Sequence, residues 1–212
     1  MDLADFRRSY TQGRLTESDL TPHPFTLFDL WLQQVIDSGI PDPTAMTVAT
    51  VDAEGQPSQR IVLLKDATEE GFVFFTNLGS NKAKDLEANQ KISLHFPWYL
   101  MERQVKVNGV AEPLSRARVA RYFLSRPKES QVAAWASKQS QPISTRELLM
   151  TQFSQLKEKF SKGEVPVPDF WGGFLVKPHK IEFWQGGEHR MHDRFEYLKQ
   201  ADGTWSTQRL MP

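Results

Sequence analysis

The hydrophobic positions along the chain follow two different periods. Between a capping Thr26 and a terminating Gly39, apolar residues recur at helical spacing, namely Leu27, Leu30, Trp31 and Val35. Short runs rich in β-branched and aromatic residues predict strands at 45–51, 58–65, 72–76, 92–96, 103–111, 173–177, 180–184, 192–198 and 205–210. Further helices are predicted at 2–10, 80–89, 115–125, 128–137 and 144–161, with loops at 11–25 and 162–168.

The order of these elements bears on the fold class. Strands and helices do not alternate regularly, which argues against a doubly wound parallel sheet. Turn residues at Asp52–Gly55 and at Asp202–Gly203 join neighbouring strands into hairpins. The pattern therefore predicts a mainly β protein, an antiparallel, Greek-key-like barrel with helical insertions at about 115–161.

Composition narrows the class of function. The 26 basic and 26 acidic residues cancel, so nothing indicates a nucleic-acid or membrane partner, and any anion site must be local. Cysteine is absent, and no histidine spacing supports a metal site. There is no apolar leader, no run of about 20 apolar residues, and no common nucleotide-binding or zinc-protease motif. We expect a cytoplasmic protein without a structural metal.

Three cations near the C-terminus recur at every second position: Arg190, His192 and Arg194. In an extended strand these side chains share one face, where like charges repel unless an anion lies against them. They follow a Trp-Gln-Gly-Gly turn, where backbone can approach a ligand closely. The alternative is a solvated edge strand whose cations discourage aggregation.

Two cations flank the apolar run between Arg60 and Lys65. In a regular strand they point to opposite faces and serve different groups, unless a bulge intervenes. The alternative is that both extend from the strand ends into water. Further along, Ser80 begins a helix with Lys82 in its first turn, which is unfavourable for the helix but favourable for a phosphate at its N-terminus. The alternative there is a plain serine cap.

A third cationic spot combines hydroxyls with a guanidinium. Tyr122 and Arg126 lie four residues apart on one predicted helix, and Ser130 begins the next helix after Pro127. Such a set suits a phosphate group. The alternative, which this segment taken alone favours, is a group of helix-surface residues beside a turn. Gln104, Gln139 and Ser140 are weaker polar signals. Several separate anion spots indicate a phosphorylated cofactor together with a phosphorylated substrate.

Seven strings in one order resemble pyridoxamine 5′-phosphate oxidases over nearly the whole chain: RIVLLK (60–65), FTNLGS (75–80), ERQV (102–105), SRP (125–127), WASKQS (135–140), FWGG (170–173) and IEFWQGGEHRMHDRF (181–195). The resemblance implies a split β-barrel homodimer that binds FMN in clefts between its subunits. It also implies oxidation of pyridoxamine or pyridoxine 5′-phosphate to pyridoxal 5′-phosphate, with oxygen reduced to hydrogen peroxide. Residues 1–25 then form an N-terminal lid on a single domain at 26–212.

The resemblance also assigns roles to residues. Those implied to hold FMN are Arg60, Ile61, Val62, Leu63, Leu64, Lys65, Phe75, Thr76, Asn81, Lys82, Gln104, Gln139, Ser140, Trp184 and Arg194. Those implied to bind the substrate are Arg7, Arg8, Ser9, Tyr10, Lys65, Tyr122, Arg126, Ser130, Arg190, Met191 and His192, with Arg190 and His192 as the catalytic pair over the pyridine ring.

The sequence departs from the family pattern at three positions. Asn81 stands where many members have Arg, Phe75 replaces a frequent Tyr, and Ser9 replaces a frequent acid. Two alternative functions remain open: a flavin reductase on the same barrel, and a flavin- or pyridoxal-phosphate-binding carrier that does not turn over.

Overall fold

The structure is a computed structural model, and it describes residue 3 and residues 8–212 of the chain. The helix expected at 2–10 falls mostly outside these residues, as does the predicted site residue Arg7. Residues 8–10 form no helix. Within the described part, no helix is long and apolar enough to cross a membrane.

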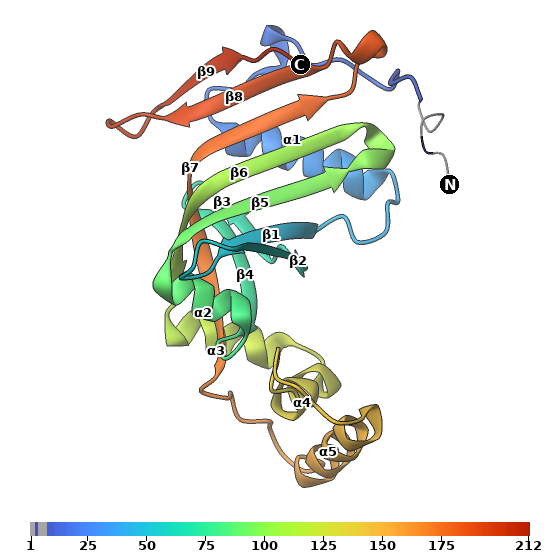
Figure 1. Ribbon diagram of the computed structural model, residues 1–212, viewed down its shortest axis with the longest axis vertical. Coiled ribbons are helices and arrows are strands. Elements are labelled where there is room, and N and C mark those ends of the chain that lie inside the picture. The colour runs from blue at the N-terminus through green and yellow to red at the C-terminus, as the bar shows by residue number, and fades with distance from the viewer. Residues whose placement is uncertain (1–2, 4–7) are drawn as a thin grey trace.

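One antiparallel sheet of nine strands organises the described chain (Figure 1). Its order is β2-β1-β5-β6-β7-β4-β3, and β8 and β9 extend it from β7. The strands are β1 (Ala45–Val51), β2 (Pro57–Leu63), β3 (Asp66–Thr68), β4 (Gly71–Asn77), β5 (Lys91–Trp98), β6 (Arg103–Pro113), β7 (Trp171–Gln185), β8 (Asp193–Lys199) and β9 (Trp205–Arg209). The prediction of a mainly β, antiparallel fold with added helices is confirmed.

Strand β7 corrects one expectation. We predicted two strands, at 173–177 and 180–184, because Pro178 lies between them, yet β7 is continuous from Trp171 to Gln185. It pairs with β6 from Phe174 to Gln185, and a register shift between Asn108 and Gly109 accommodates the proline. A Cβ on Gly109 would lie 2.5 Å from the Lys177 carbonyl oxygen, so only glycine permits this approach.

In the described residues, five α-helices accompany the sheet: α1 (Pro24–Asp37), α2 (Asn81–Ala88), α3 (Arg116–Ser125), α4 (Lys128–Ala136) and α5 (Arg146–Lys159). Single-turn 3₁₀ helices lie at Glu17–Asp19, Tyr99–Met101 and Glu188–Arg190. Helix α1 begins before the predicted cap Thr26: His23 is the N-cap and Pro24 occupies the first turn, where its missing N–H costs nothing. Leu30 is 52% exposed and does not belong to the buried side.

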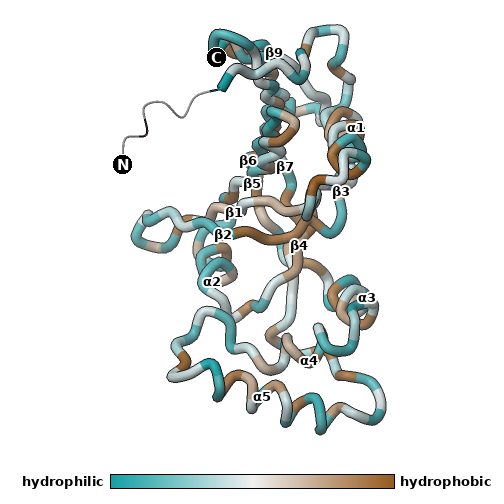
Figure 2. The backbone as a smooth tube through the Cα atoms, turned by 90° about the vertical axis from the view of Figure 1, so that its right-hand side faces the viewer, coloured by the Kyte–Doolittle hydropathy of each residue, from teal (hydrophilic) through white to brown (hydrophobic). Residues whose placement is uncertain are grey.

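The main core lies between α1 and the sheet (Figure 2). Phe28 is fully buried, with its ring centroid 5.0 Å from those of Phe72 and Phe96. A second, smaller core forms under α3 and α4, around Phe123 and Val132. This second core fixes the α3–α4 junction beside β4 and the beginning of β7.

Candidate functional site

A cavity of about 760 Å³ opens between β2, β4, the start of α2, and the α3–α4 junction. Its volume lies within the range of small-molecule sites. It brings together most of the residues predicted to bind cofactor and substrate phosphate: Arg60, Ile61, Val62, Leu63, Lys65, Phe75, Thr76, Asn81, Lys82, Tyr122, Arg126, Ser130, Gln139 and Ser140. We predicted that Arg60 and Lys65 point to opposite faces of one strand, but both line this cavity. Strand β2 ends at Leu63, so the alternation of side chains along a strand does not extend to Lys65.

Lys82 is the buried cation of this cavity, only 6% exposed. Its Nζ lies 3.1 Å from Thr76 Oγ1 and 3.2 Å from both Ser80 Oγ and Gln139 Oε1. Among the described residues it has no carboxylate at ion-pair distance. Burial, reinforced by the Arg60 charge, lowers the pKa of Lys82 to about 8. The ammonium group is therefore hydrogen-bonded by neutral oxygens, and the Asp85 charge only partly offsets the effects of burial and Arg60 on its pKa.

Arg60 approaches the same end of the cavity from β2. Its guanidinium donates to Thr50 Oγ1 at 2.7 Å and to Ser58 Oγ at 2.6 Å, and Asp85 lies 3.9 Å away. Burial lowers the pKa of Arg60, although Asp85 opposes this. The hydroxyls hold the guanidinium in place without fully neutralising it.

The N-terminus of α2 lies beside these cations, and its Asn81 N–H donates to Ser140 Oγ at 3.3 Å. Ser80 is its N-cap and is fully buried, but its hydroxyl does not cap the helix. Instead Ser80 Oγ accepts from Lys82, and the first turn contains no acid. The positive end of the helix dipole thus adds to the charges of Lys82 and Arg60, an arrangement that attracts phosphate.

A second part of the cavity wall is built from aromatic rings and one guanidinium. Tyr122 stacks on Phe75 with centroids 3.8 Å apart and ring planes 13° from parallel. Arg126 lies over the Trp171 ring at 4.3 Å, and its Nη1 is buried without a hydrogen-bond partner in the described structure. Burial lowers the pKa of Arg126 and raises that of Tyr122. A buried donor without a partner is costly, which marks it as a place for an acceptor from outside the chain.

Sequence reasoning missed several residues of the cavity: Asn77, Pro127, Ala134, Ser137 and Trp171. Trp171 had a signal, because it precedes the pair Gly172–Gly173. A Cβ on Gly173 would lie 2.7 Å from the Phe74 carbonyl oxygen and 2.8 Å from the Phe75 ring. The glycine therefore lets β7 press against β4 and brings Trp171 to the cavity.

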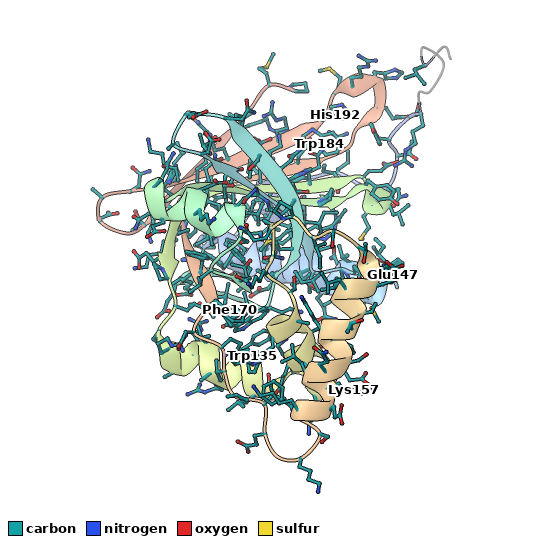
Figure 3. The ribbon with its side chains drawn as sticks, turned by 60° about the horizontal axis from the view of Figure 1, so that its bottom comes forward. Trp135, Glu147, Lys157, Phe170, Trp184 and His192 are labelled. Atoms are coloured by element: carbon teal, nitrogen blue, oxygen red, sulfur yellow. The ribbon has the colours of Figure 1, made fainter. Side chains whose placement is uncertain are left out.

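A second group of predicted residues lies away from the cavity, around the end of β7 (Figure 3). The His192 ring lies 4.6 Å from that of Trp184 and 5.6 Å from that of Tyr10. His192 Nδ1 accepts from the Gly187 N–H at 3.1 Å, so its neutral form carries the proton on Nε2. Burial, Arg190 and Arg194 together lower the pKa of His192.

The prediction that Arg190, His192 and Arg194 share one strand face is wrong. Strand β8 begins only at Asp193, and Arg190 ends a 3₁₀ turn with φ +64°, after His189 with φ +55°. The glycines before the turn and the two left-handed residues bend the chain, so alternation does not apply. Arg194 lies in the strand, where it donates to Glu182 at 2.9 Å and to the Met211 carbonyl at 2.8 Å.

The remaining predicted residues also lie outside the cavity. Leu64 is in the main core, and Gln104 bonds His95 Nε2 at 3.1 Å while pairing with Trp184 across β6 and β7. Met191 is 67% exposed. Arg8, Ser9 and Tyr10 belong to the N-terminal segment beside Trp184. A single chain thus holds two separate groups of predicted site residues.

The fold is an antiparallel split barrel with a cationic cavity beside β2 and β4. The family model described as "Pyridoxamine 5′-phosphate oxidase" matches residues 32–160, and that described as "Pyridoxine 5′-phosphate oxidase C-terminal dimerisation region" matches residues 171–212. The chain belongs to the pyridoxamine 5′-phosphate oxidase family and is an oxidoreductase.

Curated relatives match the whole chain. The pyridoxine/pyridoxamine 5′-phosphate oxidase of Alteromonas mediterranea is 66% identical over 212 residues, and that of Pseudoalteromonas translucida is 62% identical, each covering 100% of both proteins. Among solved structures, PhzG from Burkholderia lata, in complex with tetrahydrophenazine-1-carboxylic acid, superposes with a TM-score of 0.88 at 26% identity, covering 93% of this chain and 98% of PhzG. A related FMN-binding protein from Nostoc punctiforme shares the fold, with a TM-score of 0.75 at 13% identity, covering 91% of this chain and 100% of its own.

Proposed function

We propose that the protein oxidises pyridoxamine 5′-phosphate and pyridoxine 5′-phosphate to pyridoxal 5′-phosphate with bound FMN, reducing oxygen to hydrogen peroxide. The observation that carries the proposal is a cavity with cations at two places in its wall. Among the described residues, Lys82 is buried without a carboxylate at ion-pair distance, and the half-buried Arg126 has a buried Nη1 without a hydrogen-bond partner. Two phosphates at separate positions fit one phosphorylated cofactor and one phosphorylated substrate. The full-length relatives are named pyridoxine/pyridoxamine 5′-phosphate oxidases, which supports the two proposed substrates.

The end formed by Lys82, Arg60 and the α2 N-terminus is proposed to hold the FMN phosphate. Lys82 lacks a carboxylate partner within the described chain, so a phosphate dianion would supply the missing charge. The β2 residues that line the cavity between Arg60 and Lys65 are proposed to contact the flavin. When bound, the flavin accepts electrons from the substrate and passes them to oxygen.

The end formed by Arg126, Tyr122, Ser130 and Lys65 is proposed to hold the substrate phosphate. The unpartnered Nη1 of Arg126 would donate to it, and the Trp171 ring beneath keeps the guanidinium from turning away. Anchoring the phosphate at a fixed distance from the flavin site orients the pyridine ring for reaction.

Arg190 and His192 are proposed to contact the pyridine ring across a subunit boundary. They lie outside their own chain's cavity, and residues 171–212 match a dimerisation region. Strand β2 is an edge strand whose Ile61 and Leu63, which line the cavity, are 73% and 41% exposed. In the proposed homodimer a second copy covers this edge and completes the site. Arg190 acts there through charge and orientation, while His192 is the candidate for proton transfer.

The decisive experiment measures both the flavin content of the purified protein and its consumption of oxygen with pyridoxine 5′-phosphate. The purified protein is expected to be yellow, to contain one FMN per chain, and to consume oxygen when given pyridoxine 5′-phosphate, with hydrogen peroxide formed in equal amount. A yellow protein that consumes no oxygen would support the carrier alternative. Oxidation of NADH without any response to pyridoxine 5′-phosphate would support the flavin reductase.

A further inference from the structure

Residues 8–15, named here the N-terminal strap, cross the end of β7 without forming a helix or strand. The strap contacts two acidic side chains, those of Glu102 and Asp193, and each of these residues is only 3% exposed. The strap also contains Tyr10, whose ring lies edge-on to those of Trp184 and His192, with centroid distances of 5.8 and 5.6 Å. Buried carboxylates are rare unless they are fully bonded, so their partners are informative.

Glu102 anchors the first half of the strap. Its Oε2 accepts from the Gln12 N–H at 3.0 Å, and its Oε1 lies 3.5 Å from the Arg8 guanidinium. The backbone of Glu102, at φ +55°, turns so that its carbonyl accepts from the Gly186 N–H at 2.7 Å. One residue therefore joins the strap to the glycine turn that leads to His192.

Asp193 anchors the second half. Its Oδ2 accepts from Arg14 Nε at 2.9 Å and from the Leu15 N–H at 3.1 Å, while its Oδ1 accepts from Arg209 at 2.8 Å. Burial opposes ionisation of Asp193, but these hydrogen bonds outweigh it and hold its pKa below the usual value. Asp193 directly follows His192, so the strap is tied to the residue next to the imidazole.

The strap is also in close contact with the glycine turn itself. A Cβ on Gly186 would lie 2.8 Å from Tyr10 Cβ, which leaves no room between them. The imidazole of His192 is thus enclosed by Trp184 and Tyr10, with the Gly187 N–H on its Nδ1. If the strap shifts, Tyr10 leaves and one wall of this enclosure is lost.

We propose that Glu102 and Asp193 are positioning residues for the oxidation: they fix the strap so that Tyr10 holds His192 against Trp184. The inference rests on the proposed function and goes beyond it, because neither carboxylate lines the cavity. Their effect on turnover passes through Tyr10.

The test is a double-mutant cycle on the FMN-saturated enzyme, with rates expressed per bound flavin. The variants are Glu102→Gln, Asp193→Asn, Tyr10→Ala, and each carboxylate variant combined with Tyr10→Ala. Each single change is expected to lower kcat/KM for pyridoxine 5′-phosphate about tenfold, because a displaced group near the reacting centre costs of this order. The double variants are expected to lose less than about twofold beyond Tyr10→Ala, because coupled residues are not additive.

Glu17→Gln is the matched control. Glu17 accepts from Arg209 at 2.8 and 3.1 Å and so belongs to the same charge network, but it is exposed and bonds no strap residue. Its variant is expected to keep kcat/KM within about twofold of the parent. Additive losses in the cycles, or a lower melting temperature with unchanged kcat/KM, would show that the carboxylates only stabilise the fold. The Glu102 cycle alone decides the question if Asp193→Asn does not fold.

An NMR titration of His192 tests the same inference without turnover, and so separates it from the proposed function. Releasing the strap exposes the imidazole, while Arg190 and Arg194 stay nearby, so the lowered pKa of His192 should rise. Equal rises in Glu102→Gln, Tyr10→Ala and their combination support the inference even if the parent consumes no oxygen. An unchanged pKa of His192 in Glu102→Gln would overturn it.

Discussion

The cations of the cavity and those around the N-terminal strap differ in their partners. In the cavity, Lys82 bonds only neutral oxygens and Arg126 leaves a buried Nη1 unpartnered within the described structure. Around the strap, Arg14 and Arg209 both bond Asp193 at 2.8–2.9 Å. Lys82 and Arg126 thus lack a carboxylate partner among the described residues, whereas Arg14 and Arg209 share one.

This difference distinguishes cations that are available to bind a ligand from cations that stabilise the fold. A buried cation without an anion costs free energy in the folded chain, and the cost is recovered only when a ligand supplies the charge. A cation already paired with a buried carboxylate holds chain segments together. Substitutions in the cavity should therefore change ligand affinity more than stability, and those around the strap should change geometry.

Arg126→Ala should give the largest effect on catalysis. The KM for pyridoxine 5′-phosphate is expected to rise about 10- to 100-fold, because a charge-assisted hydrogen bond contributes about 1.5–3 kcal/mol. FMN should remain bound, as measured by absorbance after gel filtration. Loss of flavin with an unchanged KM would mean that the two phosphate positions are exchanged.

Lys82→Met should weaken FMN binding by about tenfold or more, because it removes one charged donor of the proposed phosphate site. The apo variant should melt no lower than the parent, since a buried uncompensated charge is lost. Fluorescence titration gives the affinity, and calorimetry of both apo proteins gives the stability. A large drop in stability with unchanged affinity would place Lys82 among the structural cations.

Arg190→Met should lower kcat/KM for pyridoxine 5′-phosphate about tenfold, since it removes a charge proposed to orient the ring. Flavin content should not change, because Arg190 lies outside the cavity of its own chain. A preserved kcat/KM would refute the role assigned to Arg190. Arg190→Lys is the matched variant, because it keeps the positive charge but lacks the planar guanidinium group with its paired donors.

A smaller effect is expected from pH. Lys82 has a pKa of about 8 in the folded apo protein against 10.5 ordinarily, so it loses its proton as pH rises through 8. FMN affinity of the apo protein should fall about threefold to tenfold between pH 7 and pH 9. Between pH 8 and pH 10.5 the unfolded chain keeps the Lys82 proton while the folded apo protein loses it. The free energy of unfolding of the apo protein should therefore rise with pH over this range. Lys82→Met should abolish this dependence.

The smallest effect should come from the exposed pair Lys157–Glu129. Its atoms lie 2.7 Å apart, but the two side chains are 58% and 73% exposed, and Lys157 lies on the outer helix α5 (Figure 3). Lys157→Ala should leave the melting temperature, FMN affinity and KM unchanged within error. A measurable change in KM would extend the site beyond the cavity.

Local patterns predicted most of the fold. Strand β1 spans the predicted residues 45–51, and α2 to α5 lie within two residues of their expected bounds. The errors have tertiary causes. Pro178 ends a strand by local rules, but the register shift at Gly109 accommodates it. The predicted alternation of side chains between the two faces of a strand does not occur near Arg190, because His189 and Arg190 both adopt positive φ.

The sequence predicted which types of residue form the candidate site, but not how those residues are arranged in space. Cations beside hydroxyls and helix starts indicated phosphate, and the cavity gathers them. Nothing in the spacing showed that Arg190 and His192 lie apart from Arg126 in one chain, since this depends on how β7 crosses the sheet. The anchoring roles of Glu102 and Asp193 were also hidden, because their partners lie 90 and 178 residues away.

Strand β7 has a consequence for synthesis of the chain on the ribosome. It lies between β4 and β6 in the sheet, yet it follows both in sequence, at residues 171–185. Until it emerges, β4 and β6 each present an unpaired edge, and Phe74 and Val105 lack neighbours from β7. The nascent protein therefore passes through a long interval with exposed sheet edges, in which chaperone binding competes with aggregation.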